Sequence, residues 1–126
     1  MDLLYEEDTY LIIGAAIAVH QELGNGFLEA VYQEALEKEF QIRKIPYKHE
    51  VPLTIYYKNE PLNKIYLADF ICFEKIIIEL KALPAITSDH QAQILNYLKA
   101  SRLKLGLILN FGKQSLEHKR IIKEKN

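Results

Sequence analysis

Three charged side chains lie within segments that are otherwise apolar. Asp69 interrupts the run 66–73, and Glu79 and Lys81 follow the apolar run 76–78. A charge inside a central strand is costly unless it is paired or bound to a metal. Two carboxylates can hold a hard cation such as Mg²⁺, which polarises a phosphodiester and activates a bound water, and a lysine can offset transition-state charge. The pattern therefore indicates either metal-dependent phosphodiester hydrolysis or a structural salt-bridge cluster at a sheet edge.

The relative placement of these side chains depends on the register of a predicted hairpin. Glu79 and Lys81 are two residues apart in a strand expected over 76–82, so they share one face of it. A strict two-residue turn would pair Asp69 with Leu80 and turn Asp69 to the opposite face. A three-residue turn or a bulge would place Asp69 on the face of Glu79 and Lys81, and the chemistry requires that register.

The motifs around these residues resemble those of the PD-(D/E)XK nucleases. The spacing Asp69-x₉-Glu79-x-Lys81 is similar to their D…ExK core. The string GFLE (26–29) resembles the G-x-x-E motif of RecB-type members, and QILNY (93–97) resembles their Q-x-x-x-Y motif. Each motif is short, but all occur in the order of the family and on the expected elements. With them, the nuclease interpretation is favoured over the salt-bridge cluster.

A longer string, GFLEAVY (26–32), resembles the pattern of the GxxExxY proteins, a small prokaryotic family of the same superfamily. The resemblance extends over nearly the whole chain, from about residue 12 to residue 121. It implies an α/β fold of the PD-(D/E)XK, restriction-endonuclease-like type. The expected architecture is a mixed central sheet of about four strands flanked by helices.

The resemblance also implies roles for individual side chains. Lys81 would be the catalytic lysine. Glu29 would reach the site from its helix, either ligating the metal or holding a metal-bound water. Gln93 and Tyr97, one helical turn apart on one face, would position Lys81, the metal or the substrate phosphate. The metal ligands would be Asp69, Glu79, the Leu80 carbonyl and Glu29.

Hydrophobic periodicity predicts the elements that carry these residues. Asp8 or Thr9 is expected to cap the first helix, which Gly24-Asn25-Gly26 ends, and Thr87 or Ser88 is expected to cap the third. No linker or repeat divides the chain, so residues 1–126 are expected to form a single domain. Helices are expected over 9–23, 27–44, 85–100 and 114–125, and strands over 51–57, 64–73, 76–82 and 103–111.

Charge is unevenly distributed along the chain. Residues 99–126 hold eight Lys or Arg and two Asp or Glu, a net charge of +6, whereas residues 1–98 carry a net charge of −7. A basic segment on an acidic body can dock the phosphates of a nucleic acid. The alternative is a Lys-rich terminal helix with its polar face in water. The predicted phosphate contacts are Arg102, Lys104, Lys113, Lys119 and Arg120.

Several other side chains have more than one interpretation. His20 is expected to favour a helix dipole or bond a carbonyl, with a role in the site as the alternative. Tyr56, Tyr57 and Tyr66 could stack on bases, but packing between strands explains them better. Cys72, the single cysteine, excludes an internal disulfide and is expected to be a small buried hydrophobe.

The sequence therefore predicts a nuclease that uses Mg²⁺ or Mn²⁺ and acts on nucleic acid, with DNA as the expected substrate. The alternative is a module of the same fold that binds nucleic acid or a protein partner without turnover. Because no specificity domain is added, a homo-oligomer or a protein partner could supply specificity. The chain starts without a secretory signal pattern and has no apolar run long enough for a bilayer, so a cytoplasmic location without membrane association is expected.

Overall fold

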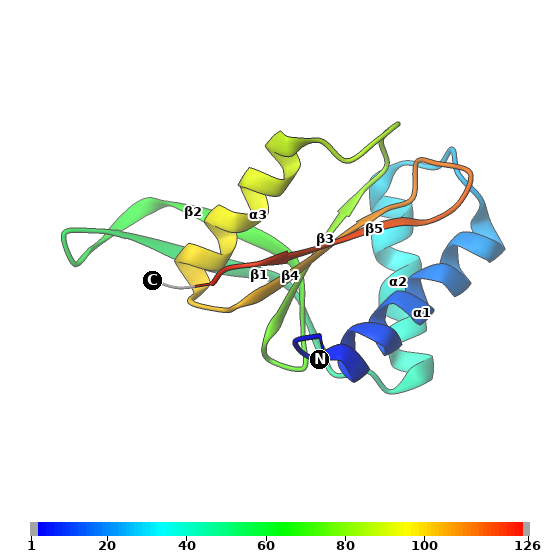
Figure 1. Ribbon diagram of the computed structural model, residues 1–126, viewed down its shortest axis with the longest axis horizontal. Coiled ribbons are helices and arrows are strands. Elements are labelled where there is room, and N and C mark those ends of the chain that lie inside the picture. The colour runs from blue at the N-terminus through cyan, green and yellow to red at the C-terminus, as the bar shows by residue number, and fades with distance from the viewer. Residues whose placement is uncertain (1–2, 125–126) are drawn as a thin grey trace.

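The computed structural model describes residues 3–124 and shows a mixed α/β fold (Figure 1). Its sheet has the strand order β1-β2-β3-β4-β5, in which β3 and β4 are parallel and the other neighbours are antiparallel. This confirms the mixed sheet flanked by helices, although the sheet has five strands instead of about four. The elements are α1 (Glu6–Leu23), α2 (Glu29–Arg43), β1 (Tyr47–Tyr57), β2 (Glu60–Cys72), β3 (Ile76–Lys81), α3 (Ser88–Ser101), β4 (Leu105–Asn110) and β5 (Glu117–Ile122).

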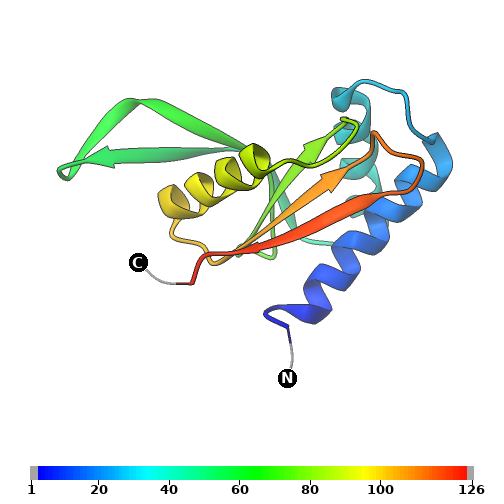
Figure 2. The same ribbon diagram turned by 45° about the horizontal axis from the view of Figure 1, so that its top comes forward.

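Helices cover both faces of the sheet (Figure 2). On one face, α1 and α2 bury residues such as Ile12 and Phe40 against Ile78 of β3. On the other face, α3 buries Ile94 and Leu98 against the sheet. Every residue of β4 and all of β3 except its last are buried, as expected for strands covered on both faces. The central strands are therefore held in place by packing on both faces, and Lys81 at the end of β3 is partly exposed.

The close packing of α3 depends on Gly106 in β4. A Cβ atom at this position would approach the Ile94 side chain to 2.5 Å, well inside the normal contact distance. The absence of a side chain lets α3 settle onto the sheet, and α3 carries Gln93 and Tyr97. The packing of this helix thus helps to fix where these two side chains lie.

The C-terminal segment expected as a helix over 114–125 is instead a strand, so that prediction was wrong. Strand β5 pairs with β4 over the whole length of both, for example Ile108 with Lys119. Without β5, the buried strand β4 would leave one row of backbone N–H and C=O groups unpaired. Pairing along this edge outweighs the modest helix preference of a Lys- and Glu-rich segment.

The ends of α1 agree in part with those predicted from the sequence. Gly24 and Gly26 have φ values of 70° and 111°, which confirms that they end α1. The expectation that Asp8 or Thr9 caps α1 was wrong, because the helix starts at Glu6 after Tyr5 and has no side-chain cap. The helix begins before Asp8 and Thr9, and Thr9 instead donates a hydrogen bond to the Glu6 carbonyl within its first turn.

Strands β1 and β2 are longer than expected and form a hairpin that extends away from the rest of the molecule in both views (Figures 1 and 2). Its tip is the two-residue turn Lys58-Asn59, in which both residues have positive φ. We call residues 54–66 of this hairpin the arm. Tyr56 and Tyr57 are each 62% exposed on it, so strand packing does not account for these two tyrosines.

Among the described residues, none of the helices combines the length and hydrophobicity needed to cross a membrane.

Candidate active site

The turn between β2 and β3 sets the register of the three charged residues. Cys72 pairs with Ile76, which leaves a three-residue turn, and Phe70 pairs with Ile78. Continuing this register places Asp69 opposite Glu79. The strands therefore have the alignment that the chemistry requires and not the one that pairs Asp69 with Leu80.

Regular backbone pairing between β2 and β3 gives way to side-chain hydrogen bonds where the acidic residues begin. The backbone N–H of Asp69 donates to Glu79 Oε1 at 2.9 Å, and the backbone N–H of Leu80 donates to Asp69 Oδ2 at 2.8 Å. The two carboxylates thus lie between the strands and each is oriented by the partner strand. This geometry brings two oxygen ligands together at one position on the sheet.

A residue that the sequence analysis did not consider also orients Asp69. The side-chain amide of Gln33, on α2, donates to Asp69 Oδ1 at 2.9 Å. Both oxygens of Asp69 therefore accept a hydrogen bond from a neutral donor. Gln33 follows Glu29 by one helical turn, and this spacing was the available sequence signal, because residues at i and i+4 share a helix face.

Burial raises the pKa values of the carboxyl groups of Glu79 and Asp69. Glu79 is 6% exposed, and its burial followed by the negative charge of Asp69 raises its pKa to about 8. Burial also raises the pKa of Asp69, while the Leu80 N–H and the charge of Lys81 act in the opposite direction. At neutral pH the pair holds negative charge in a poorly solvated place, which a bound cation would stabilise.

Glu29 at the start of α2 belongs to the same electrostatic group. Although the residue as a whole is exposed, partial burial of its carboxyl raises its pKa, and the charge of Asp69 raises it further. The charge of Lys81 lowers it. The charges of Asp69 on β2 and of Lys81 on β3 thus both act on Glu29, although no hydrogen bond in the described part of the chain joins Glu29 to either residue.

Lys81, at the end of β3, contacts α3, which carries the two residues of the Q-x-x-x-Y motif. Lys81 Nζ donates to Gln93 Oε1 at 3.1 Å. Tyr97 is 7% exposed, and burial followed by the charges of Glu79 and Asp69 raises its pKa to about 12. A neutral phenol and an amide thus flank the lysine and the carboxylates.

The residues present fit a hard divalent cation held by few protein ligands. Within residues 3–124, no three His, Cys, Asp or Glu side chains converge to form a cage for a metal. Two carboxylates and waters are the ligand set that Mg²⁺ usually takes when it also binds a phosphate. Asp69 and Glu79 provide such a pair, and the Leu80 carbonyl lies in the same stretch of β3.

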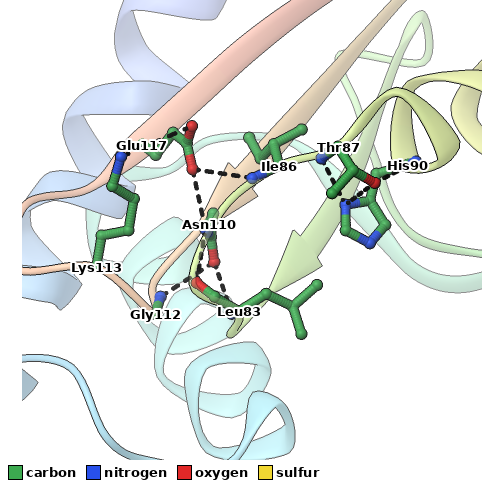
Figure 3. Close-up of polar contacts among 8 residues, drawn as sticks. All are labelled: Leu83, Ile86, Thr87, His90, Asn110, Gly112, Lys113 and Glu117. Atoms are coloured by element: carbon green, nitrogen blue, oxygen red, sulfur yellow. Dashed lines mark hydrogen bonds and ion pairs between the residues drawn. The ribbon is translucent and has the colours of Figure 1, made fainter.

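A buried amide fixes the connection between β3 and α3 (Figure 3). Asn110 is fully buried, and its Oδ1 accepts from the N–H groups of Leu83 and Gly112 at 2.9 and 3.1 Å. Its Nδ2 donates to the Leu83 carbonyl at 2.9 Å and to Glu117 Oε1 at 3.0 Å. The same Glu117 oxygen accepts from the Ile86 N–H.

This network holds the chain immediately after Lys81. The helix that follows begins at Thr87, which is its N-cap as predicted and forms a reciprocal capping box with His90. His90 is therefore engaged in the cap. Because Lys81 precedes the held residues Leu83 and Ile86 and Gln93 lies in the helix that follows them, the network helps to position the lysine and its partner relative to each other.

Asn110→Ala is expected to destabilise the protein by about 2–4 kcal/mol, because it leaves partly buried backbone groups of Leu83 and Gly112 without their partner and removes a fully buried side chain. Urea unfolding measures the loss, and amide exchange should accelerate first at Leu83 and Ile86. Asn63→Ala, at an exposed position of the arm, is the matched control and should change stability little. Equal stability of the two variants would contradict a clamp at Asn110.

The predicted phosphate-binding residues do not form one patch. Arg102 follows α3, Lys104 is exposed just before β4, and Lys113 lies beyond the opposite end of β4, where it faces Glu117 at 4.0 Å. Lys119 is exposed on β5. Arg120 is held against the N-terminal part of the chain, since its guanidinium donates to Thr9 Oγ1 and to the Leu4 carbonyl. Its role in the structure is to join β5 to α1.

Two other residues have structural partners. His20 is buried, and its Nε2 lies 2.8 Å from the Lys113 carbonyl while its ring stacks on Phe111. It bonds a carbonyl, as one interpretation of the sequence predicted, but that carbonyl belongs to the loop after β4 and not to its own helix. Cys72 is buried in the core, and burial raises the pKa of its thiol, as expected for a small hydrophobe.

Comparisons with known proteins identify the family and the fold. The family model described as the PD-(D/E)XK nuclease superfamily matches residues 6–121. A crystal structure of the protein SSO0001 has the same fold, with a TM-score of 0.58 and 16% sequence identity over 94% of this chain and 67% of that one. Among curated proteins, none matches the sequence significantly.

Proposed function

The chain belongs to the PD-(D/E)XK nuclease superfamily, and we propose that it is a metal-dependent nuclease that hydrolyses phosphodiester bonds in DNA. One observation carries the proposal. Asp69 and Glu79 come from neighbouring strands and are joined by the hydrogen bond from the Asp69 N–H to Glu79 Oε1, and Lys81, two residues further, donates a hydrogen bond to Gln93. Within the superfamily we place the chain with the GxxExxY proteins, because residues 26–32 read GFLEAVY.

In this proposal the carboxylates of Asp69 and Glu79 hold Mg²⁺ or Mn²⁺, with the Leu80 carbonyl as a further ligand. When bound, the cation would polarise the scissile phosphate and lower the pKa of a water. Gln33 and the Leu80 N–H keep Asp69 oriented for this task. Glu29 would hold a water at the edge of the site, since the charges of Asp69 and Lys81 both act on the pKa of its carboxyl.

The cationic end of Lys81 supplies the second element of the mechanism. Its ammonium group would orient the attacking water or stabilise the negative charge that develops on phosphate oxygens. Gln93 restricts the lysine to one direction by accepting its hydrogen bond. Tyr97 stays protonated at neutral pH and can donate its phenolic hydrogen to a phosphate oxygen.

The test is a cleavage assay on the purified chain with labelled single- and double-stranded DNA and RNA, in Mg²⁺, in Mn²⁺ and in EDTA. We expect cleavage of DNA that EDTA abolishes and that Asp69→Asn does not show, because the substituted amide is a poorer ligand for a hard cation. Asp89→Asn, at an exposed position of α3, is the matched control. Absence of cleavage of every substrate in both metals would favour a binding module of the same fold.

A further inference from the structure

A groove runs between the arm and the C-terminal half of α3. It has a volume of about 530 Å³ and is lined by side chains that include Tyr56, Tyr66, Asn96, Lys99 and Arg102. The described lining residues include two cations and no acid, in contrast to the net negative charge of residues 1–98. The groove thus combines exposed aromatic surface with positive charge.

The groove leads toward the acidic site along one side of α3. The Tyr66 ring packs against the Tyr97 ring with centroids 4.9 Å apart. Tyr97 in turn lies close enough to Glu79 and Asp69 for their charges to raise its pKa. Gln93 and Asn96 are three residues apart on the helix, so they lie on neighbouring positions of one face. A chain that occupied the groove would therefore reach the proposed catalytic residues.

From these observations, and resting on the proposed nuclease function, we propose that the groove binds an unpaired strand of the nucleic-acid substrate next to the scissile phosphate. A base would stack on Tyr56, and the adjoining phosphates would contact Lys99 and Arg102. Stacking on an exposed aromatic ring needs an open base face, which a base inside a duplex does not offer. A volume of this size suits one or two nucleotides and not a double helix.

The arm provides a matched pair of variants. Tyr56 and Tyr57 are adjacent and equally exposed, at 62% each, but Tyr56 lines the groove and Tyr57 does not. Tyr56→Ala should weaken binding of a labelled single-stranded oligodeoxynucleotide by about 5- to 150-fold. Tyr57→Ala and Tyr56→Phe should stay near wild type, and thermal unfolding verifies that each variant is folded.

The cations are tested through salt dependence. In Lys99→Gln combined with Arg102→Asn, the slope of log affinity against log salt should flatten by about 1.4, since each phosphate contact on a single strand contributes about 0.7. Asparagine is chosen because Arg102 has a φ of 63°, which asparagine tolerates. Lys38→Gln on α2, across the sheet from the groove, should leave the slope unchanged.

Binding is measured by fluorescence anisotropy in Ca²⁺, on the single strand and on the same sequence as a duplex, with the oligonucleotide checked for intactness. Equal losses in Tyr56→Ala and Tyr57→Ala, or equal losses for single strand and duplex, would overturn the inference. Cleavage in Mg²⁺ is scored separately. A chain that cleaves nothing yet loses single-strand binding in Tyr56→Ala supports the groove and rejects the proposed activity. If the protein cleaves DNA but all groove variants bind the single strand as well as wild type, the proposed activity is supported and the groove is rejected.

Discussion

Lys81→Ala is expected to lower metal-dependent cleavage by about 100- to 1000-fold, the usual effect of removing one group that stabilises transition-state charge. Nucleic-acid affinity should change by less than about threefold, because the lysine acts on charge that develops during the reaction and not on the bound ground state. Single-turnover cleavage at saturating enzyme measures the chemical step, and anisotropy measures affinity on the same samples.

Two further variants separate this role from general loss of positive charge. Gln93→Ala leaves the ammonium in place but removes its hydrogen-bond acceptor, so the loss of rate should be smaller than for Lys81→Ala. Lys75→Ala removes a lysine from the turn before the same strand, where it pairs with Asp8 at 2.9 Å, and should leave the rate unchanged. Wild-type rates in Lys81→Ala would remove the lysine from the mechanism.

The acidic and basic residues of the site could be predicted from sequence because their types conflict with their surroundings. Asp69 and Glu79 stand within apolar strands, and such positions have few explanations other than chemistry or pairing. The spacing of Glu79 and Lys81 placed them on one face without further information. For these residues, local composition and strand periodicity carried nearly all of the signal.

The register of Asp69 could not be decided in the same way. A three-residue turn requires Phe73 and Glu74 to adopt φ values of 56° and 59°, which residues with a Cβ seldom do. Burial of the strands decides the outcome. In the observed register Phe70 and Cys72 of β2 pack in the same cluster as Ile78 of β3. A shift by one residue would turn one strand's apolar side chains away from that cluster.

The C-terminal strand and the hydrogen bond from Gln33 to Asp69 could not be predicted from local sequence for a different reason. Strand β5 is mostly polar and has only a short apolar end, Ile121-Ile122. Its pairing is imposed by the otherwise open edge of β4, which is an apolar strand. Gln33 is an ordinary helix residue until α2 packs over β2 and brings its amide to Asp69. Both depend on contacts between distant segments, which composition does not record.

The second large effect concerns the folding stability that the protein loses by holding the carboxyl group of Glu79 next to that of Asp69. Without metal at pH 8, Glu79→Gln is expected to be more stable than wild type by about 1–3 kcal/mol. The wild-type protein must ionise a buried carboxyl beside the charge of Asp69, and glutamine removes that requirement while keeping an oxygen to accept from the Asp69 N–H. Thermal unfolding in EDTA at several pH values measures the difference.

The sign of the pH dependence follows from the direction of the shift. The pKa of Glu79 is raised from 4.5 to about 8 in the folded protein. Its contribution to stability is complete below about pH 4.5, where the carboxyl is protonated in both states, and is lost as the pH rises through 8. Wild type should therefore lose stability between these values, and Glu79→Gln should lose less.

Mn²⁺ should reverse the order of stability, so that wild type becomes more stable than Glu79→Gln. A cation that binds the folded state stabilises it in proportion to its affinity, and glutamine in place of Glu79 removes one anionic ligand. Wild type should gain several degrees in unfolding temperature on addition of Mn²⁺, whereas Glu79→Gln should gain little. Glu74→Gln, an exposed change in the turn before the same strand, should follow wild type in both conditions. If Glu79→Gln were the less stable protein in EDTA at pH 8, or gained as much from Mn²⁺ as wild type, Glu79 would be a structural acid and not a metal ligand.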